Sequence, residues 1–360
     1  KENLLNKDLF VCGSHFSKKF GMTVDEIKND KIKIKYTLKQ KIKNDDPKSS
    51  IQIINQINLK LAKIFVSKKY DALIVLGDRY EVLSASLTAK MFNIPIIHLH
   101  GGESTIALVD DVIRHAVTKL SSLHFVSHKK YKSRVISMGE NPKNVYCVGG
   151  IGASNIKSTK LLKKYEIEKK IDFKIPKRFF LVTYHPLTLD NKKSDIEYNN
   201  LISVIKNYKD ITFFFSAPNF DPNHKKIFKG IDILEKKYSN IKFFKSFGIQ
   251  IYYSLIKLSM GIIGNSSSGI LEVPSFKKPT INIGDRQGGR IRSVSIIDVN
   301  SRSKNINKAI RKVLFNRSFS EKIKKTINPY YKPKTVENII KVLKKRNFNQ
   351  LNKKIFYEKN

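Results

Sequence analysis

Small polar side chains interrupt the sequence where an expected buried strand passes into an expected helix. In "LSMGIIGNSSSGILEVPSF", an apolar run is followed by Asn265, Ser266 and Ser267 and then by a helix-compatible segment. Hydroxyl groups and the free backbone N–H groups at the start of a helix are suited to bind an anion. Three arginines lie in the later stretch "INIGDRQGGRIRS": Arg286, Arg290 and Arg292. Because guanidinium groups bind phosphate through paired hydrogen bonds, we interpret "GNSSSG" as a diphosphate cradle rather than a flexible linker.

Carboxylate and imidazole side chains follow two apolar runs in the first half of the chain. "LIVLGDRYE" places Asp78 and Arg79 after such a run, and "IIHLHGGEST" places His98, His100 and Glu103 around two glycines. Asp78 is equally well interpreted as a helix N-cap. The histidines and Glu103 fit either a metal site or a tight turn beside a core histidine. Neither motif alone decides between chemistry and structure.

Two further motifs carry charged or titratable groups. In "VDDVIRHAVTK", Asp110 and Asp111 can cap a helix and face its positive end. Arg114 lies four residues after Asp110, a spacing that lets the two pair on one helix face. In "LVTYHPLT", His185 stands directly after an apolar run of the second half. The aspartates and Arg114 also fit a purely structural role.

Short apolar runs alternate with longer amphipathic segments along the whole chain. In residues 53–70, for example, apolar side chains recur close to the helical period. The predicted strands are residues 9–12, 71–77, 94–100, 123–127, 145–149, 179–185, 211–217, 241–245, 260–264, 280–284 and 295–299. Such alternation predicts an α/β fold with parallel sheets covered on both faces. Ligands of such sheets bind outside the carboxyl ends of the strands, where the polar motifs lie.

The strands fall into two groups separated by a charged, helix-like stretch, which predicts two parallel-sheet domains. The predicted divisions are an N-terminal domain, a linker, a C-terminal domain and a final helical segment: residues 1–160, 161–176, 177–330 and 331–360. The final helix, "TVENIIKVLKKRN", can pack onto either domain.

The charge of the chain is unusual. It has 69 Lys and Arg residues against 30 Asp and Glu, a formal net charge of +39, which raises the possibility of nucleic-acid binding. However, the lysines are scattered rather than gathered in one stripe, and no nucleic-acid motif accompanies them. No run of about 18 apolar residues predicts a membrane span. The two cysteines, Cys12 and Cys147, are too few for a disulfide framework and favour a reducing, cytoplasmic location.

Taken together, the motifs resemble the hydrolysing UDP-N-acetylglucosamine 2-epimerases of sialic-acid, legionaminic-acid and related nonulosonic-acid synthesis. "LGDRYE", "HLHGGE", "DDVIRHAVTKLSSLHF", "GNSSSGILEVPS" and "INIGDRQGGR" occur in order and span most of the chain. The resemblance implies two Rossmann-like domains facing across a cleft, as in B-type (GT-B) glycosyltransferases. It also implies a metal-free and cofactor-free reaction: a base removes the C2 proton, UDP leaves from C1, and water adds to the resulting 2-acetamidoglucal.

For the first domain, the resemblance assigns Asp78 and Asp110 to acidic positions of this chemistry, and Arg79 and Arg114 to arginines of the substrate site. Many relatives carry a glutamate at the third position of a His-x-Glu-Gly-Gly stretch, where this sequence has His100. Either Glu103 or His100 is expected to take over its acid–base role.

For the second domain, the resemblance places His185 near the diphosphate, as a further catalytic candidate. It assigns Ser266 and Ser267 to phosphate contacts, Glu272 to the ribose, and Arg286 to a nearby position. The family's opening strand and Gly-[Ser/Thr]-Arg-Ala-[Asp/Glu] loop would precede Lys1. A chain that began at Lys1 is expected to lack a central strand of the first sheet and to be inactive.

The expected partner is a UDP-sugar, either UDP-N-acetylglucosamine or its 2,4-diacetamido-2,4,6-trideoxy analogue, which no residue distinguishes. A homo-oligomer, dimer or tetramer, is also expected, and no nucleic acid, membrane, metal or cofactor. Two alternatives stay open: a nucleotide-sugar-dependent glycosyltransferase on the same fold, which fold alone does not separate from an epimerase, and a basic nucleic-acid-binding protein.

Overall fold

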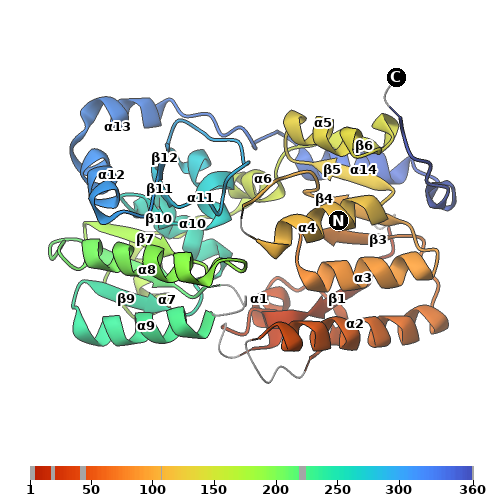
Figure 1. Ribbon diagram of the computed structural model, residues 1–360, viewed down its shortest axis with the longest axis horizontal. Coiled ribbons are helices and arrows are strands. Elements are labelled where there is room, and N and C mark those ends of the chain that lie inside the picture. The colour runs from red at the N-terminus through yellow and green to blue at the C-terminus, as the bar shows by residue number, and fades with distance from the viewer. Residues whose placement is uncertain (1–4, 18–20, 41–45, 107, 219–223, 359–360) are drawn as a thin grey trace.

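The computed structural model describes residues 5–17, 21–40, 46–106, 108–218 and 224–358, and they form two lobes (Figure 1). The elements of the first lobe are β1 (Leu9–Cys12), α1 (Val24–Asn29), β2 (Ile34–Leu38), α2 (Pro47–Ser67), β3 (Leu73–Leu76), α3 (Tyr80–Met91), β4 (Ile96–Leu99), α4 (Val109–Leu120), β5 (Leu123–Val126), α5 (Lys129–Ser137), β6 (Val145–Cys147) and α14 (Thr335–Lys344). Helix α6 (Ile151–Ser158) leads from this lobe towards the second.

The second lobe contains the remaining helices and strands. They are α7 (Lys164–Ile171), β7 (Phe179–Thr183), α8 (Asn191–Ile205), β8 (Thr212–Ser216), α9 (His224–Lys237), β9 (Ile241–Phe244), α10 (Gly248–Leu258), β10 (Ile262–Gly264), α11 (Ser267–Leu271), β11 (Thr280–Ile283), β12 (Ile296–Val299), α12 (Ser303–Phe315) and α13 (Arg317–Lys324). Helix α7 falls within residues 161–176, the predicted linker, and its Ile167 is fully buried against Phe179 and Leu181 of β7. The domain limits themselves stay a prediction.

The second lobe is built on a parallel sheet in the strand order β12-β11-β10-β7-β8-β9. Chain order reverses between β10 and β7, as in doubly wound nucleotide-binding sheets, which bind ligands at that point. Every residue of β7 is buried, as expected for a strand that helices cover on both faces.

The first lobe differs from the prediction in one respect. Its strands form a parallel sheet in the order β3-β4-β5-β6 and, among the described residues, a separate two-stranded parallel ladder of β1 and β2. The prediction of one sheet in this half was therefore wrong, and β2 was not predicted. The other strands lie where the apolar runs placed them.

Helix α2 follows from its sequence. The Asp46 side chain accepts a hydrogen bond from the Ser49 backbone N–H (2.7 Å), and Pro47 occupies the first helical turn, so the helix begins there. Its buried side chains recur at the predicted helical spacing: Ile53, Ile57, Leu61 and Phe65.

Helix α14 returns to the first lobe although it lies near the end of the chain, as the blue ribbon beside β5 and β6 shows (Figure 1). Its Ile339 and Leu343 share a buried cluster with Leu123, Phe125 and Val148. Described segments from both before and after the second lobe in the sequence thus pack into the first lobe.

Candidate active site

Asp78 is held by Arg114 at the carboxyl end of β3. Asp78 Oδ2 accepts hydrogen bonds from Arg114 Nε (3.0 Å) and Nη2. Arg114 Nη1 also donates to Asp111 Oδ1 (2.9 Å) and to the Glu103 carbonyl oxygen (3.1 Å). The Arg114 side chain is 1% exposed, whereas that of Asp78 is 22% exposed. A buried cation thus fixes a carboxylate that can still be reached from solvent.

Arg114 pairs with Asp111, the neighbour of the aspartate that was predicted to pair with it. Both aspartates lie in the first turn of α4, near its positive end, as predicted. Arg114 Nη1 donates to Asp111 Oδ1, and the Asp111 carboxylate also accepts from the Thr105 N–H (2.7 Å). Asp111 is therefore a site residue that was not predicted, and it directly follows Asp110, which was. Asp110 itself is buried.

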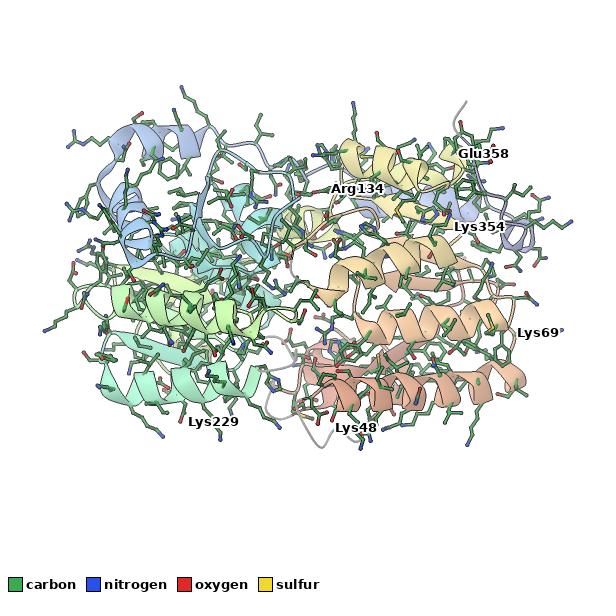
Figure 2. All side chains as sticks on the ribbon, in the orientation of Figure 1. Lys48, Lys69, Arg134, Lys229, Lys354 and Glu358 are labelled. Carbon is green, nitrogen blue, oxygen red and sulfur yellow. The ribbon has the colours of Figure 1, made fainter. Side chains whose placement is uncertain are left out.

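The "HLHGGE" stretch folds into a tight loop after β4. His100 and Gly102 have left-handed backbone conformations, with φ of 67° and 76°. A Cβ atom on Gly102 would lie 2.7 Å from the Tyr131 carbonyl oxygen, so glycine is required there. Arg134, labelled in Figure 2, donates to the Gly102 carbonyl oxygen (2.6 Å). The loop turns Glu103 back into the lobe, where it is 1% exposed.

The two acid–base candidates of this loop form a hydrogen-bonded pair. His100 Nδ1 lies 3.0 Å from Glu103 Oε1, and His100 Nε2 accepts from the Ile151 N–H (3.1 Å) at the start of α6. Because Nε2 accepts, Nδ1 carries the proton and donates to Glu103. Burial alone would raise the pKa of the Glu103 carboxyl, but the Arg290 guanidinium and the His100 hydrogen bond hold it well below its usual range.

His98 is a core histidine. It is fully buried, and its Nε2–H donates to the Gly77 carbonyl oxygen (2.8 Å). Burial lowers its pKa to about 3, so the imidazole is neutral at physiological pH. Among the described residues, no group of three or more His, Cys, Asp or Glu side chains is placed to hold a metal ion.

On the second lobe, His185 and the "GNSSSG" stretch meet where the strand order reverses. The Asn265 side chain accepts from the His185 N–H (2.7 Å) and donates to the His185 carbonyl oxygen (2.9 Å). Ser266 and Ser267 follow at the start of α11, both partly exposed. Arg286 is buried, and its Nη1 donates to the Asn265 carbonyl oxygen (3.2 Å).

Glu272 lies at the end of α11 and faces the first lobe. It accepts a hydrogen bond from Ser268 Oγ (2.8 Å), and a Cβ atom on Gly152 of α6 would lie 2.4 Å from its Oε1. Burial raises the pKa of the Glu272 carboxyl, although hydrogen bonds from Ser268 and Tyr253 act in the opposite direction. The positive charge available at His100 also lowers it, so these two predicted residues lie near each other across the lobes.

Two of the three arginines predicted for phosphate binding form ion pairs with carboxylates of the protein. Arg292 Nε donates to Asp298 Oδ2 (2.9 Å) within the second lobe. Arg290 Nε donates to Glu103 Oε2 (2.9 Å) in the first lobe. The sequence located both arginines but not their partners, because the partners lie on segments distant in the chain.

A cavity of about 540 Å³ lies between the lobes. Its walls include Cys12, Arg79 and Glu81 from the first lobe and Pro218 and Lys245 from the second. Of the predicted site residues, Arg79 lines it. The remaining predicted residues lie around the loop of Glu103 and the switch point of the second sheet.

The strand order of the second lobe, with Ser266, Ser267 and Arg286 near its switch point, is typical of doubly wound α/β proteins that bind nucleotides. A second α/β lobe adds carboxylates and histidines to that site. The chain belongs to the UDP-N-acetylglucosamine 2-epimerase family, which it matches over residues 1–344. The family resemblance predicted from the motifs is therefore confirmed.

Individual relatives place the chain near the hydrolysing branch of the family. It is 38% identical to the polysialic acid biosynthesis protein P7 of Escherichia coli over 341 residues, 94% of this chain and 86% of the relative. It is 39% identical to the GDP/UDP-N,N'-diacetylbacillosamine 2-epimerase (hydrolyzing) of Campylobacter jejuni over 295 residues, 82% of this chain and 77% of the relative.

Solved structures share the fold. The Neisseria meningitidis UDP-GlcNAc 2-epimerase bound to UDP-GlcNAc superposes with a TM-score of 0.80 at 20% identity, covering 96% of this chain and 93% of that one. The predicted fold class, an α/β protein with parallel sheets whose solved neighbours are of the GT-B type, is thus confirmed, and the doubly wound strand order is seen in the second lobe.

Proposed function

We propose that the protein is a hydrolysing 2-epimerase that converts a UDP-activated 2-acetamido sugar and water to UDP and the free 2-epimerised sugar. The substrate is UDP-N-acetylglucosamine or its 2,4-diacetamido-2,4,6-trideoxy analogue. The observation that carries the proposal is the acidic group on the first lobe, which meets an anion cradle on the second. The hydrolysing epimerases among its relatives support it.

The second lobe binds the UDP moiety in this proposal. Ser266 and Ser267 offer hydroxyl and backbone N–H groups to the diphosphate, and Arg286 contributes positive charge beside them. His185, held on both sides by the Asn265 amide, lies after the neighbouring strand. Glu272 accepts the ribose hydroxyls. These groups favour departure of UDP because they stabilise the negative charge that develops on it.

The first lobe handles the sugar. A carboxylate, for which Asp78 is the foremost candidate and Asp110 the second, removes the C2 proton. The C2–H electron pair forms the C1–C2 double bond while the C1–O bond breaks and UDP leaves with its electrons. Water then adds its oxygen to C1 and a proton to C2 on the opposite face. Arg114 holds Asp78 in a fixed orientation for the first step through hydrogen bonds to Oδ2.

His100 and Glu103 act as one unit in the same proposal. The Glu103 carboxylate holds the imidazole with its proton on Nδ1, and Nε2 can take a proton only when its hydrogen bond from the Ile151 N–H opens. The side chain of His100 is 15% exposed and that of Glu103 is 2% exposed, so the histidine is the more accessible member.

The test is to incubate the protein with each UDP-sugar in turn and with no acceptor. We expect one UDP and one free 2-epimerised sugar for each substrate consumed, in a reaction that persists in EDTA. The product analysis also selects between the two sugars. UDP release that required an added acceptor would indicate a glycosyltransferase instead, and loss of turnover on chelation, restored by Zn²⁺ or Mn²⁺, would contradict a metal-free mechanism.

A further inference from the structure

The loop after β11, residues 284–292, belongs to the second lobe but is anchored on the first. The Ile291 N–H donates to the hydroxyl oxygens of Tyr131 (3.1 Å) and Tyr330 (2.8 Å). The Arg286 carbonyl oxygen accepts from the Ile106 N–H (3.4 Å). These contacts fix both ends of the loop against the "HGGE" side of the first lobe.

Two glycines allow this close approach. A Cβ atom on Gly288 would lie 2.3 Å from a side-chain carbon of Ile106, and one on Gly289 would lie 2.8 Å from the Ser104 Cβ. Gly289 also has a left-handed backbone conformation, with φ of 82°. The "QGGR" stretch is therefore shaped to lie on the loop that carries Glu103.

Arg290 connects the two lobes within this contact. Its Nε donates to Glu103 Oε2, and the two side chains are 8% and 2% exposed, so the ion pair is shielded from solvent. Removing one partner of such a pair leaves a buried charge without compensation. The His100 and Ser127 hydrogen bonds to Oε1 would then be the remaining support of Glu103.

A hydrogen-bond chain continues from Arg290 into the UDP side of the site. Arg290 Nη1 donates to Gln287 Oε1, and Gln287 Nε2 donates to the Asn265 carbonyl oxygen (2.7 Å). Asn265 in turn holds both backbone polar groups of His185. The Arg290 guanidinium thus links the cradle of the second lobe to the Glu103–His100 pair of the first.

We propose that Arg290 is a positioning residue, which fixes Glu103 and through it His100 only when the second lobe lies closed against the first. This inference rests on the proposed epimerase function, since it makes the sugar-side groups depend on closure around UDP. Arg290 itself need not touch the substrate. Its side chain sets the position and the charge of the Glu103 carboxylate.

The sign of the expected pH effect follows from the charges around Glu103. The titratable and charged groups that face it are Arg290, His100, Arg114, Tyr131 and Tyr330. Without Arg290, the pKa of the Glu103 carboxyl rises towards or above its usual range, since burial then acts against less positive charge. Protonation of Glu103 would therefore begin at a higher pH in the variant.

The experiment compares Arg290→Gln and Arg290→Lys with the parent protein and with Arg178→Gln. Arg178 forms an exposed ion pair with Asp210 within the second lobe, so its replacement controls for the loss of one positive charge. We expect Arg290→Gln to lower kcat on the order of 10–100-fold, the scale of a small misplacement of catalytic groups, with UDP affinity changed less than about threefold. The acid limb of its kcat–pH profile should move to higher pH.

Arg290→Lys keeps the charge but loses the planar fork. The acid limb of its kcat–pH profile should therefore lie closer to that of the parent than the limb of Arg290→Gln does, while kcat still falls. Small-angle scattering with and without UDP measures closure directly and does not depend on turnover. We expect UDP to make the parent and Arg178→Gln more compact and Arg290→Gln less so.

Three results would overturn the proposal: a parent-like kcat and pH profile in Arg290→Gln, an equal loss of UDP affinity and kcat with an unmoved acid limb, or unchanged compaction by UDP. If the Gln variant fails to fold, the Lys variant provides the same comparisons. A parent protein that binds UDP and closes, yet releases no UDP from either sugar, would contradict the proposed function while leaving the Arg290 contact measurable by scattering.

Discussion

Arg114 shows how one buried charge organises several others. Its guanidinium donates to Asp78, to Asp111 and to the backbone of the loop that ends in Glu103. Each partner comes from a different strand end or helix start. Because the fork offers donors in fixed directions, the carboxylates hold fixed positions as well. Asp78 thereby combines a partly exposed carboxylate with a rigid orientation, which suits a group that removes a proton.

The first prediction concerns Asp78. Asp78→Asn keeps the size of the side chain but removes its basicity, so turnover should fall on the order of 100-fold or more, the usual scale for an acid–base group. UDP affinity should stay within a few-fold, because the cradle is untouched. Turnover, UDP calorimetry and melting temperature on the same preparations check this, with the exposed Asp210→Asn as control. Near-parental turnover per folded molecule would remove Asp78 from the mechanism.

The second prediction concerns Glu272. Burial raises the pKa of its carboxyl, and binding of the ribose hydroxyls favours the ionised form. UDP affinity is therefore fully present above that raised pKa and is lost as the pH falls through it. Glu272→Gln should bind UDP roughly 1–3 kcal/mol more weakly at neutral pH, because it replaces a charged acceptor. It should also lack this pH dependence.

Calorimetry from pH 5 to pH 7.5 measures both proteins. UDP itself titrates in this range, so the ratio of the two affinities is the informative quantity. We expect the ratio to shrink as the pH falls. A constant ratio would mean that Glu272 does not contact the nucleotide.

Much of the site could be predicted because polar residues at strand ends of parallel sheets converge. That rule located Asp78, His100, His185 and Ser266 from the sequence. It could not predict that Arg290 turns away from phosphate to meet Glu103, since that contact joins positions 187 residues apart. The role of Asn265 was also not predicted. Nothing in a serine-rich turn indicates that an asparagine amide will hydrogen-bond to the backbone of His185, after a different strand.

At the scale of elements, the predicted strands had in common a run of apolar side chains. Strand β2 was missed for a physical reason: "IKYTL" alternates between half-buried and exposed positions until its last residue, and its neighbours are lysines. Such a sequence is typical of an edge strand with a solvated face. Helix α11 is shorter than its apolar sequence suggests because Pro274 follows, and a short 3₁₀ turn, Val273–Phe276, replaces further α-helix.

The segment after α14 is tied to the first lobe by charge. Lys354, labelled in Figure 2, lies 2.8 Å from Glu140 Oε1 and donates to the Ser121 carbonyl oxygen (2.8 Å). Lys119 Nζ and His124 Nε2 also contact the Glu140 carboxylate, at 2.8 and 3.0 Å. Burial alone would raise the pKa of Glu140, but these hydrogen bonds lower it to about 2.

The third prediction follows from this cluster. Lys354→Met should lower the free energy of unfolding by about 1–3 kcal/mol at pH 7, the range for losing a hydrogen bond to a buried charged group. Because the pKa of Glu140 is depressed in the folded protein, its contribution is present above the ordinary value of 4.5 and is lost as the pH falls towards about 2.

Urea unfolding of the parent and Lys354→Met from pH 7 down to pH 2.5, through the range in which Glu140 titrates, measures the difference in the free energy of unfolding. It should be largest at neutral pH and narrow on acidification. The exposed Lys229, on α9 of the other lobe, provides the matched control Lys229→Met, which should change stability little at any pH. A difference between parent and Lys354→Met that stayed constant with pH would mean that Lys354 acts through packing alone.

At the scale of the whole molecule, lysines are found on both lobes. The labelled Lys48, Lys69, Lys229 and Lys354 lie at separate edges of the two lobes (Figure 2). None of the described helices combines the length and the apolar character needed to cross a bilayer. A distributed charge of +39 is suited to attract small anions from all directions rather than to bind one face of a polyanion.

The fourth prediction tests this long-range attraction. A UDP-sugar carries a negatively charged diphosphate, so the field of the protein should raise its rate of encounter with the site. Salt screens such a field, whose reach is about 30 Å at 0.01 M ionic strength and about 8 Å at 0.15 M. We therefore expect kcat/KM to fall about tenfold or more between these two ionic strengths, the lower end of electrostatic steering effects. The value of kcat should stay constant, because Arg286 beside the proposed diphosphate cradle is buried and salt screens buried charges much less than exposed ones. Potassium chloride titrations, with sucrose at matched viscosity as the control, measure both constants.

A kcat that fell in parallel with kcat/KM would show that salt acts on the site or the fold. An unchanged kcat/KM would mean that the surface lysines play no part in capturing substrate.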